Sequence, residues 1–420
     1  MTTEADLLVV HAAQLLTLAG PNHAPRTGAA LAEVGLVRDG AVAAVEGIVV
    51  AAGPTAQVLD EVTPAPGAEV IDASGRVVLP GFVDPHTHLI FAGSREDEFE
   101  WRLRGARYQD ILAAGGGILS TVAATRASSE DRLVDLARPR ADGMLSHGTT
   151  TAEVKSGYGL TVDDEVKCLR AAHRLSASHD LDLVPTFLGA HAVPPEYAGE
   201  PDRYVQLVVE EMIPAVAEEG LAEFCDVFCD EGAFTPEQAR RVLQAGADAG
   251  LAPKIHADEF ADTGGARLAA EVGAVSADHL LRSSDDGLRA LAAAGTVAVL
   301  CPTTALVLGL PYARARAMVE LGVPVALASD FNPGTSPTYA MPLVIALACA
   351  GMRLTPAEAI VAATINAAHA IGMAPEVGSL EPGKAADLVV LDAPDYRHLA
   401  MQAGVHLIHT VVKRGRVVRR

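Results

Sequence analysis

The sequence has little positive charge. Its 420 residues include 32 Lys and Arg against 53 Asp and Glu, which gives a formal net charge of −21 at pH 7. A protein that binds the phosphate backbone of a nucleic acid needs a basic face. We therefore predict no nucleic-acid partner. The one basic cluster, "KRGRVVRR" at 413–420, is expected to be a solvated strand end.

Long apolar runs and paired cysteines are also missing. No stretch approaches the roughly 20 apolar residues that span a bilayer, and the first residues, "MTTEADLLVV", are acidic rather than basic as in a signal peptide. Five scattered cysteines are typical of reduced thiols rather than of a disulfide framework. Cys225 and Cys229 have the spacing of a metal-binding pair, but their apolar surroundings favour buried thiols. These features predict a cytoplasmic protein without a membrane partner.

The chain has enough hydrophobic residues, 50%, and enough length for a barrel of about 250 residues plus a smaller domain. Short segments rich in Val, Ala and Leu alternate with helix-like stretches that begin at a Thr or Ser N-cap. This alternation predicts an α/β fold, a (β/α)8 TIM-like barrel. The eight strand segments are 77–96, 149–159, 182–193, 224–234, 253–260, 274–281, 296–304 and 324–334.

The two ends of the chain have a different pattern, with strands and turns but no helices. We predict that they form one small β-sandwich domain into which the barrel is inserted, with boundaries at 1–78, 79–375 and 376–420. The long connection 94–148 includes the glycine-rich "AAGGGI", which is expected to act as a hinge rather than as a phosphate cradle.

Polar residues follow several of the predicted strands. His86 and His88 come after the first strand, and alternation along a strand points both side chains the same way. His256 follows the fifth strand, His279 the sixth and Asp330 the eighth. Because the strand ends of a barrel meet around one mouth, we expect these residues to be neighbours. Imidazoles and a carboxylate suit zinc or ferrous iron better than magnesium or calcium.

This arrangement resembles the amidohydrolase superfamily, and the resemblance covers nearly the whole chain. Members with two metals have a lysine on strand four, where this sequence reads "FCDVFCDEG"; Lys155 lies on strand two instead. The resemblance therefore implies one divalent metal ion per chain, zinc or iron, with a water completing its shell. The implied ligands are His86, His88, His256 and Asp330.

Longer motifs narrow the resemblance within that superfamily. The segments "EVKSGYGL", "FLGAHAVP", "KIHADEF", "SADHL" and "SDFNPGTSP" are similar to those of hydrolases that open an imidazolone ring bearing a propionate, giving N-formimidoyl-glutamate in histidine degradation. The implied protein is a homodimer that acts on this small molecule.

The resemblance and the chemistry together suggest a role for each polar residue. A metal-activated water would attack the ring carbonyl. His279 would orient that water and help to remove its proton, and Asp330 would pass the proton to the leaving nitrogen. Glu259 would face the ring and is a third candidate catalytic residue beside His279 and Asp330. Arg95 would hold the propionate or the ring carbonyl through its planar guanidinium.

Further substrate contacts are implied by the family pattern alone. Tyr108 lies on the long first connection and is expected to close over the ligand. The other implied contacts are Tyr158, His191, Asn332, Gly334 and Thr335.

Two alternatives remain open from the sequence. Another amidohydrolase, such as a nucleobase deaminase, would share the metal ligands but would not need a carboxylate-binding arginine. A non-catalytic barrel scaffold would be expected to have lost ligands, whereas every expected ligand is present.

Overall fold

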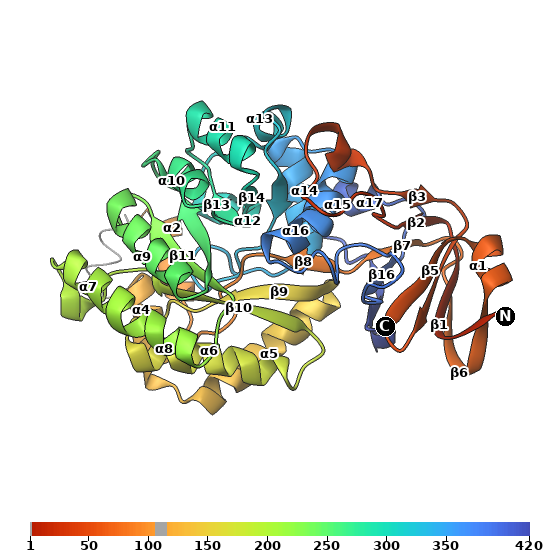
Figure 1. Ribbon diagram of the computed structural model, residues 1–420, viewed down its shortest axis with the longest axis horizontal. Coiled ribbons are helices and arrows are strands. Elements are labelled where there is room, and N and C mark those ends of the chain that lie inside the picture. Colours follow the sequence, from red (N-terminus) through yellow and green to blue (C-terminus); the bar gives the residue numbers. More distant parts are fainter. Residues whose placement is uncertain (1, 106–115) are drawn as a thin grey trace.

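The computed structural model describes residues 2–105 and 116–420. An eight-stranded parallel sheet forms the barrel, and each strand pairs with its neighbours in the sequence (Figure 1). Every strand overlaps one of the segments expected from the sequence, so the predicted (β/α)8 order is confirmed. The strands are β8 (Phe82–Asp84), β9 (Thr149–Lys155), β10 (Asp182–Ala190), β11 (Phe224–Cys229), β12 (Ala252–Ala257), β13 (Ser276–His279), β14 (Val297–Leu300) and β15 (Val325–Leu327).

The barrel closes just beyond the ends of β8 and β15. Thr87 and Phe331 form an isolated parallel bridge there. The His88 N–H donates to the Phe331 carbonyl at 2.8 Å, and the Asp330 N–H donates to the His86 carbonyl at 3.0 Å. The backbone that joins the first strand to the last therefore holds three of the implied metal ligands.

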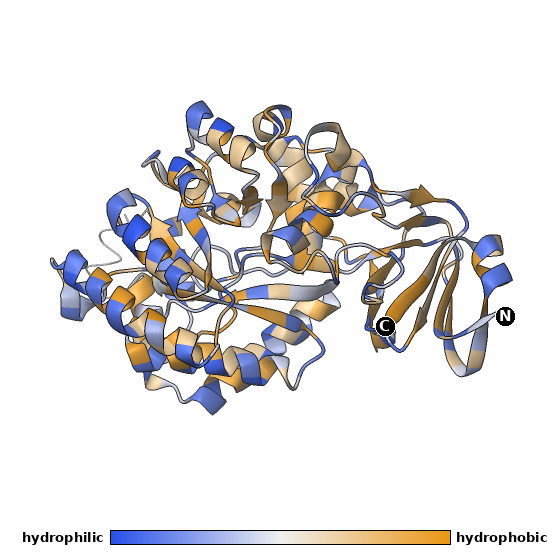
Figure 2. Ribbon diagram, viewed as in Figure 1, coloured by the Kyte–Doolittle hydropathy of each residue, from blue (hydrophilic) through white to orange (hydrophobic). Residues whose placement is uncertain are grey.

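Helices surround the barrel, and their outward faces are hydrophilic, as α7 and α9 illustrate in Figure 2. The predicted N-caps are confirmed at two helices: Thr235 caps α9 with Gln238 in a capping box, and Ser284 caps α11. The helices of the barrel region are α2 (Glu96–Leu103), α4 (Ile118–Ala127), α5 (Glu130–Ser146), α6 (Val162–Ser176), α7 (Pro201–Leu207), α8 (Ile213–Glu218), α9 (Pro236–Asp248), α10 (Gly265–Glu271), α11 (Asp285–Ala294), α12 (Pro302–Leu308), α13 (Ala315–Glu320), α14 (Met341–Met352), α15 (Pro356–Ala362) and α16 (Ile365–Ala370).

The two chain ends meet in a small β domain, where Figure 1 shows both termini. One sheet has the order β5-β4-β1-β6 and the other β18-β17-β16-β7-β2-β3, so the second sheet combines N-terminal and C-terminal strands. A separate core between them includes Val9 and Val42 from the first sheet and Val78 and Val390 from the second. The strands are β1 (Thr3–Ala12), β2 (Gln14–Leu16), β3 (Leu36–Val37), β4 (Gly40–Val45), β5 (Ile48–Pro54), β6 (Val62–Asp72), β7 (Val77–Pro80), β16 (Leu388–Leu391), β17 (Ile408–Lys413) and β18 (Arg416–Arg419), with helix α1 (Thr55–Glu61). The short helix α17 (His398–Met401), between β16 and β17, packs against α14 of the barrel region.

The chain passes from the small domain into the barrel at Gly81, between β7 and β8. The Gly81 N–H donates to the Asp387 carbonyl at 3.0 Å, and a side chain at this glycine would collide with Thr150. Lys413 adds a second tie, because its ammonium contacts Asp387 at 2.5 Å and Asp182, at the start of β10, at 2.7 Å. These contacts fix the barrel against the small domain.

Two expectations from composition can be compared with the described residues. Cys225 and Cys229 are buried free thiols, as predicted. Among the described helices, none combines the length and the apolar character needed to cross a bilayer.

Candidate metal centre and active site

Three of the implied metal ligands converge at the barrel mouth. His86 Nε2 lies 3.3 Å from His88 Nε2 and 3.4 Å from Asp330 Oδ1, and His88 Nε2 lies 3.6 Å from the same oxygen. Tetrahedral ligands at about 2.1 Å from a zinc ion lie about 3.4 Å from one another. The spacing of the three atoms therefore fits a common metal ion.

His256 and His279 lie beside this group. Their rings are 4.5 Å and 5.1 Å from the ring of His86, and the three imidazoles offer nitrogen atoms within 4.8 Å of one another. His86 therefore belongs to two groups of three donors, one with His88 and Asp330 and the other with His256 and His279. The ring of His279 lies farther from His86 than that of His256 does, but it belongs to the same group of three donors, so its assignment as the base rather than as a ligand stays a prediction.

The protonation of the group also fits a cation. Burial lowers the pKa of His86, His88 and His256 well below the usual range, and neighbouring imidazoles and Lys155 lower it further, which leaves the neutral form that binds metals. Both ring nitrogens of His256 are buried, and neither makes a hydrogen bond within the described part of the chain. Burial raises the pKa of Asp330 to about 7. Buried neutral imidazoles beside a carboxylate form a donor set suited to a divalent metal ion.

Two aspartates that the sequence analysis did not select orient these imidazoles. Asp278 Oδ2 lies 2.6 Å from His86 Nδ1, and Asp226 Oδ2 lies 3.0 Å from His256 Nδ1. Such contacts fix which nitrogen faces a metal. The available signal was an acidic residue inside each of the buried strands β11 and β13.

The backbone is strained at two of the functional positions. His279 has φ of +73° and Asp330 has φ of +52°, in the left-handed region that favours glycine. A residue without glycine's freedom costs about 1–3 kcal/mol in such a conformation. The surrounding fold therefore holds both residues, at the ends of β13 and β15, in positions that a relaxed chain would rarely adopt.

A cavity of about 690 Å³ opens above the donor group. Apolar side chains, including Phe228, Phe260 and Leu308, form part of its wall. Among the described residues, Gly334 does not line it, and Tyr108 lies outside the described part of the chain. The predicted site residues that do line the cavity are His88, Arg95, Tyr158, His191, His256, Glu259, His279, Asp330, Asn332 and Thr335.

Arg95 is held in this wall by an acid and a glycine. Its Nε donates to Glu98 Oε2 at 2.8 Å, and its guanidinium lies against Gly334, where a Cβ atom would collide with it. Arg102 donates to the Gly334 carbonyl at 3.0 Å. Gly334 thus serves the site by leaving room for Arg95.

Two loops that bear predicted contacts are folded by side chains that accept several N–H groups. The Glu165 carboxylate, which the sequence analysis did not select, accepts from Gly157, Gly159 and Leu160 at 2.7–2.9 Å and so fixes the loop of Tyr158. Asn332 Oδ1 accepts the N–H groups of Gly334 and Thr335 at 2.9 Å and 2.7 Å. The amide oxygen of Asn332 is therefore engaged within its own loop.

Glu259 is positioned in the same way by Asp230, whose Oδ2 accepts the Glu259 N–H at 2.6 Å and the Phe260 N–H at 2.9 Å. Burial, together with the charges of Asp330 and Asp230, raises the pKa of Glu259 well above its ordinary value. Its Oε1 lies 3.9 Å from His279 Nδ1. His191 stacks on His88, with ring centroids 5.0 Å apart.

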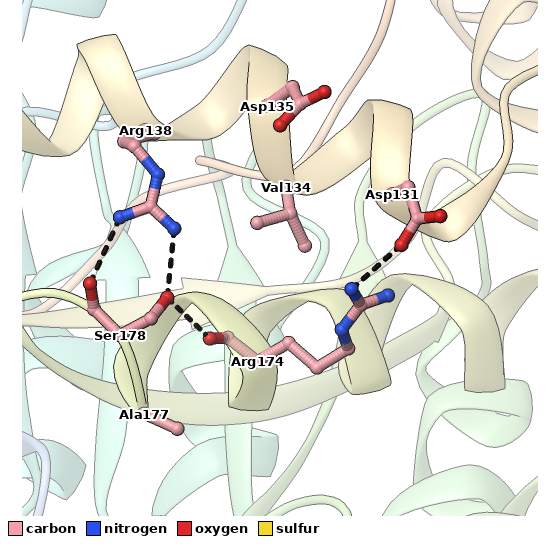
Figure 3. Close-up of a pocket in the computed structure, with 7 residues that line it drawn as sticks. All are labelled: Asp131, Val134, Asp135, Arg138, Arg174, Ala177 and Ser178. Atoms are coloured by element: carbon pink, nitrogen blue, oxygen red, sulfur yellow. Dashed lines mark hydrogen bonds and ion pairs between the residues drawn. The ribbon is translucent and has the colours of Figure 1, made fainter.

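A second hollow, of about 550 Å³, lies between α5 and α6 (Figure 3). Arg174 pairs with Asp131 at 2.7 Å across it, and Arg138 donates to the carbonyl and hydroxyl oxygens of Ser178. Exposed ion pairs of this kind contribute little to the stability of the fold. None of the predicted site residues in the described part of the chain lines this hollow.

The barrel, the His-x-His pair and the aspartate after the last strand define a class of metal-dependent hydrolases. The model of the amidohydrolase family matches residues 77–418, so the chain belongs to that family. Within it the chain belongs with the imidazolonepropionases. It is 54% identical to the imidazolonepropionase of Geobacillus kaustophilus over 98% of this chain and 97% of that one, and 55% identical to that of Symbiobacterium thermophilum over the same shares.

Solved structures share the fold at low identity. An adenosine deaminase from Xanthomonas campestris with bound zinc has a TM-score of 0.72 at 20% identity, covering 99% of this chain and 93% of that one. E. coli guanine deaminase has a TM-score of 0.73 at 17% identity, covering 98% of both chains.

Proposed function

We propose that the chain hydrolyses the ring amide C–N bond of 4-imidazolone-5-propanoate to give N-formimidoyl-L-glutamate, a step of histidine degradation. The relatives named imidazolonepropionase support this substrate. The structural observation that supports it best is that Arg95 lines the same cavity as the histidine and aspartate donors. One pocket thus combines a hydrolytic centre with a cation suited to a propionate.

In this proposal one divalent ion, zinc or ferrous iron, is held by His86, His88, His256 and Asp330. When bound, such an ion supplies a Lewis acid for the carbonyl and lowers the pKa of a bound water to about 7. Elemental analysis should find about one zinc or iron per chain, and His86→Ala should lose it because the shell is opened. Two tightly held ions per chain would contradict the proposed stoichiometry.

His279 and Asp330 move the protons. Burial lowers the pKa of His279 to about 4, so its imidazole is neutral at pH 7, and its Nδ1 makes no hydrogen bond to any described residue. The neutral ring can accept a proton as the water oxygen bonds to the ring carbonyl carbon. Asp330, whose pKa burial raises to about 7, can take up that proton and pass it to the ring nitrogen as the C–N bond breaks, which returns Asp330 to its carboxylate form.

The remaining residues hold the substrate. Arg95 would bind the propionate, while Glu259, Tyr158 and His191 would surround the ring. Asn332 and Thr335 would lie beside the substrate ring, and Gly334 would leave space for Arg95. Tyr108 would be a further substrate contact, as the resemblance implies.

The direct test is to incubate the purified, metal-loaded chain with freshly made imidazolone propionate and to follow the loss of its ultraviolet absorbance. Stoichiometric appearance of N-formimidoyl-glutamate is expected. Release of ammonia from a nucleobase, without ring opening of the imidazolone, would instead support a deaminase.

A further inference from the structure

Lys155, at the end of β9, lies beneath the metal centre and has no part in the proposed chemistry. Its side chain is fully buried. Its ammonium lies 2.7 Å from Asp226 Oδ2, 3.0 Å from Glu153 Oε2 and 3.3 Å from Asp278 Oδ2. All three carboxylates are fully buried as well. The ammonium therefore lies inside a cage of acidic oxygens, which we call the carboxylate cage: Glu153, Asp226 and Asp278.

Two oxygens of the cage also hold proposed metal ligands. Asp278 Oδ2 contacts His86 Nδ1, and Asp226 Oδ2 contacts His256 Nδ1. The cage thus adjoins the metal centre through shared atoms.

The cage depends on a cation. Burying uncompensated carboxylates is costly, and removing one partner of a buried ion pair leaves an unpaired charge that strongly destabilises the fold. Burial would lower the pKa of Lys155, but Asp226, Glu153 and Asp278 raise it overall, so the ammonium stays charged. The neighbouring Lys254 contacts Glu153 Oε1 at 2.8 Å and supplies a second positive charge from the other side.

The atoms around the ammonium have the spacing of metal ligands. One group comprises His86, Glu153 and Asp278, and another comprises Asp226, His256 and Asp278; within each group the donor atoms lie within 4.8 Å of one another. Within the described residues, Glu153 Oε2 and His256 Nδ1 are buried and make no hydrogen bond, although each has one ion-pair contact at 3.0 Å, with Lys155 Nζ and with Asp226 Oδ2 respectively. Both atoms belong to the donor groups and could bind a metal ion that took the place of the ammonium.

We propose that the Lys155 ammonium occupies a carboxylate cage that would otherwise bind a second divalent cation, and that it thereby limits the chain to one metal ion. The inference rests on the proposed metal centre, because two histidines of that centre border the cage. Carboxylate oxygens with imidazole nitrogens would suit Zn²⁺ or Mn²⁺.

The test compares the holoenzyme with Lys155→Met, which keeps the length of the side chain but removes its charge. Each protein, loaded with its first ion, is titrated with Zn²⁺ or Mn²⁺ in competition with a chromophoric chelator. The parent should retain one tightly bound ion and Lys155→Met should take up a second. Lys254→Met is the matched control, since it removes a buried lysine that contacts Glu153 from outside the cage, and it should retain one ion.

A second variant covers the case in which Lys155→Met does not fold. Lys155→Met with Glu153→Gln removes one positive and one negative charge together, and circular dichroism reports its folding. It should still bind a second ion, more weakly than Lys155→Met. If the folded variants retain one ion with the affinity of the parent, the cage is not a latent cation site. The ring-opening assay and the metal content of the unaltered parent test the proposed function separately.

Discussion

At the scale of single residues, the chemistry depends on which nitrogen of each imidazole is free. His86 and His256 present Nδ1 to buried aspartates, an arrangement typical of metal ligands. Among the described residues, no aspartate contacts His279 Nδ1 in this way, and that atom lies 3.9 Å from Glu259 Oε1 on the cavity side. This difference supports a ligand role for the first two and a proton-transfer role for His279.

The His279→Asn variant tests that separation. Turnover should fall about 10²- to 10⁴-fold because a general base is lost. The metal content should stay near that of the parent, as measured by elemental analysis of the same preparation. His86→Ala serves as the reference for a lost ligand. If the His279→Asn protein contained no metal, His279 would have to be reassigned as a metal ligand.

Arg95→Lys tests the proposed carboxylate contact. The lysine keeps the charge but loses the planar fork, so kcat/KM should fall about 10- to 150-fold, equivalent to about 1.5–3 kcal/mol. An analogue without its carboxylate should react equally poorly with parent and variant. Arg104→Lys is the control and should behave like the parent. Arg95 precedes helix α2 and Arg104 follows it, where Arg104 forms an exposed ion pair with Glu100. An Arg95→Lys enzyme as active as the parent on the acid would place the arginine outside substrate binding.

At the scale of elements, the site depends on loops whose shapes are set by close contacts. Gly334→Ala tests one of them, because the added methyl group would meet the Arg95 guanidinium. We expect kcat/KM to fall while the melting temperature stays near that of the parent. The effect should not add to that of Arg95→Lys, since both changes act on one contact. Gly53→Ala, where a Cβ meets nothing within 4 Å, is the control. Full additivity in the double variant would contradict the shared contact.

The same scale shows what the sequence could predict. Strand pattern and the polar residues that follow each strand were enough to find the order of the barrel and the residues at its mouth. The roles of Asp226 and Asp278 could not be predicted, because they depend on the register of β11 and β13 with β12, which the periodicity of the sequence does not reveal. Glu165 escaped because a glutamate in the first turn of a helix looks like an ordinary charge at a helix N-terminus. The sequence shows one apolar run where the structure has two strands, β7 and β8, separated at Gly81. Predicting that separation would require knowing that the two strands belong to different sheets.

At the scale of the whole molecule, the metal centre lies across the seam that closes the barrel. Within the described residues, β8 and β15 share no ladder, and their junction is the bridge between Thr87 and Phe331 with its adjoining backbone hydrogen bonds. His86 and His88 come from one side of the seam and Asp330 from the other. A bound ion would therefore join the first strand to the last.

Removing the metal should loosen this seam before the rest of the fold. A ligand that binds the native state at 100 times its Kd stabilises the protein by about 2.7 kcal/mol, so chelation should lower the melting temperature. Hydrogen exchange should rise most at 86–88 and 330–331, because the N–H groups of His88 and Asp330 cross the seam. Exchange in β1 and β4 of the small domain should change little, since those strands have their own core. Returning zinc or iron should restore both readouts. An equal rise across both domains would show that the metal stabilises the whole chain rather than the closure of the barrel.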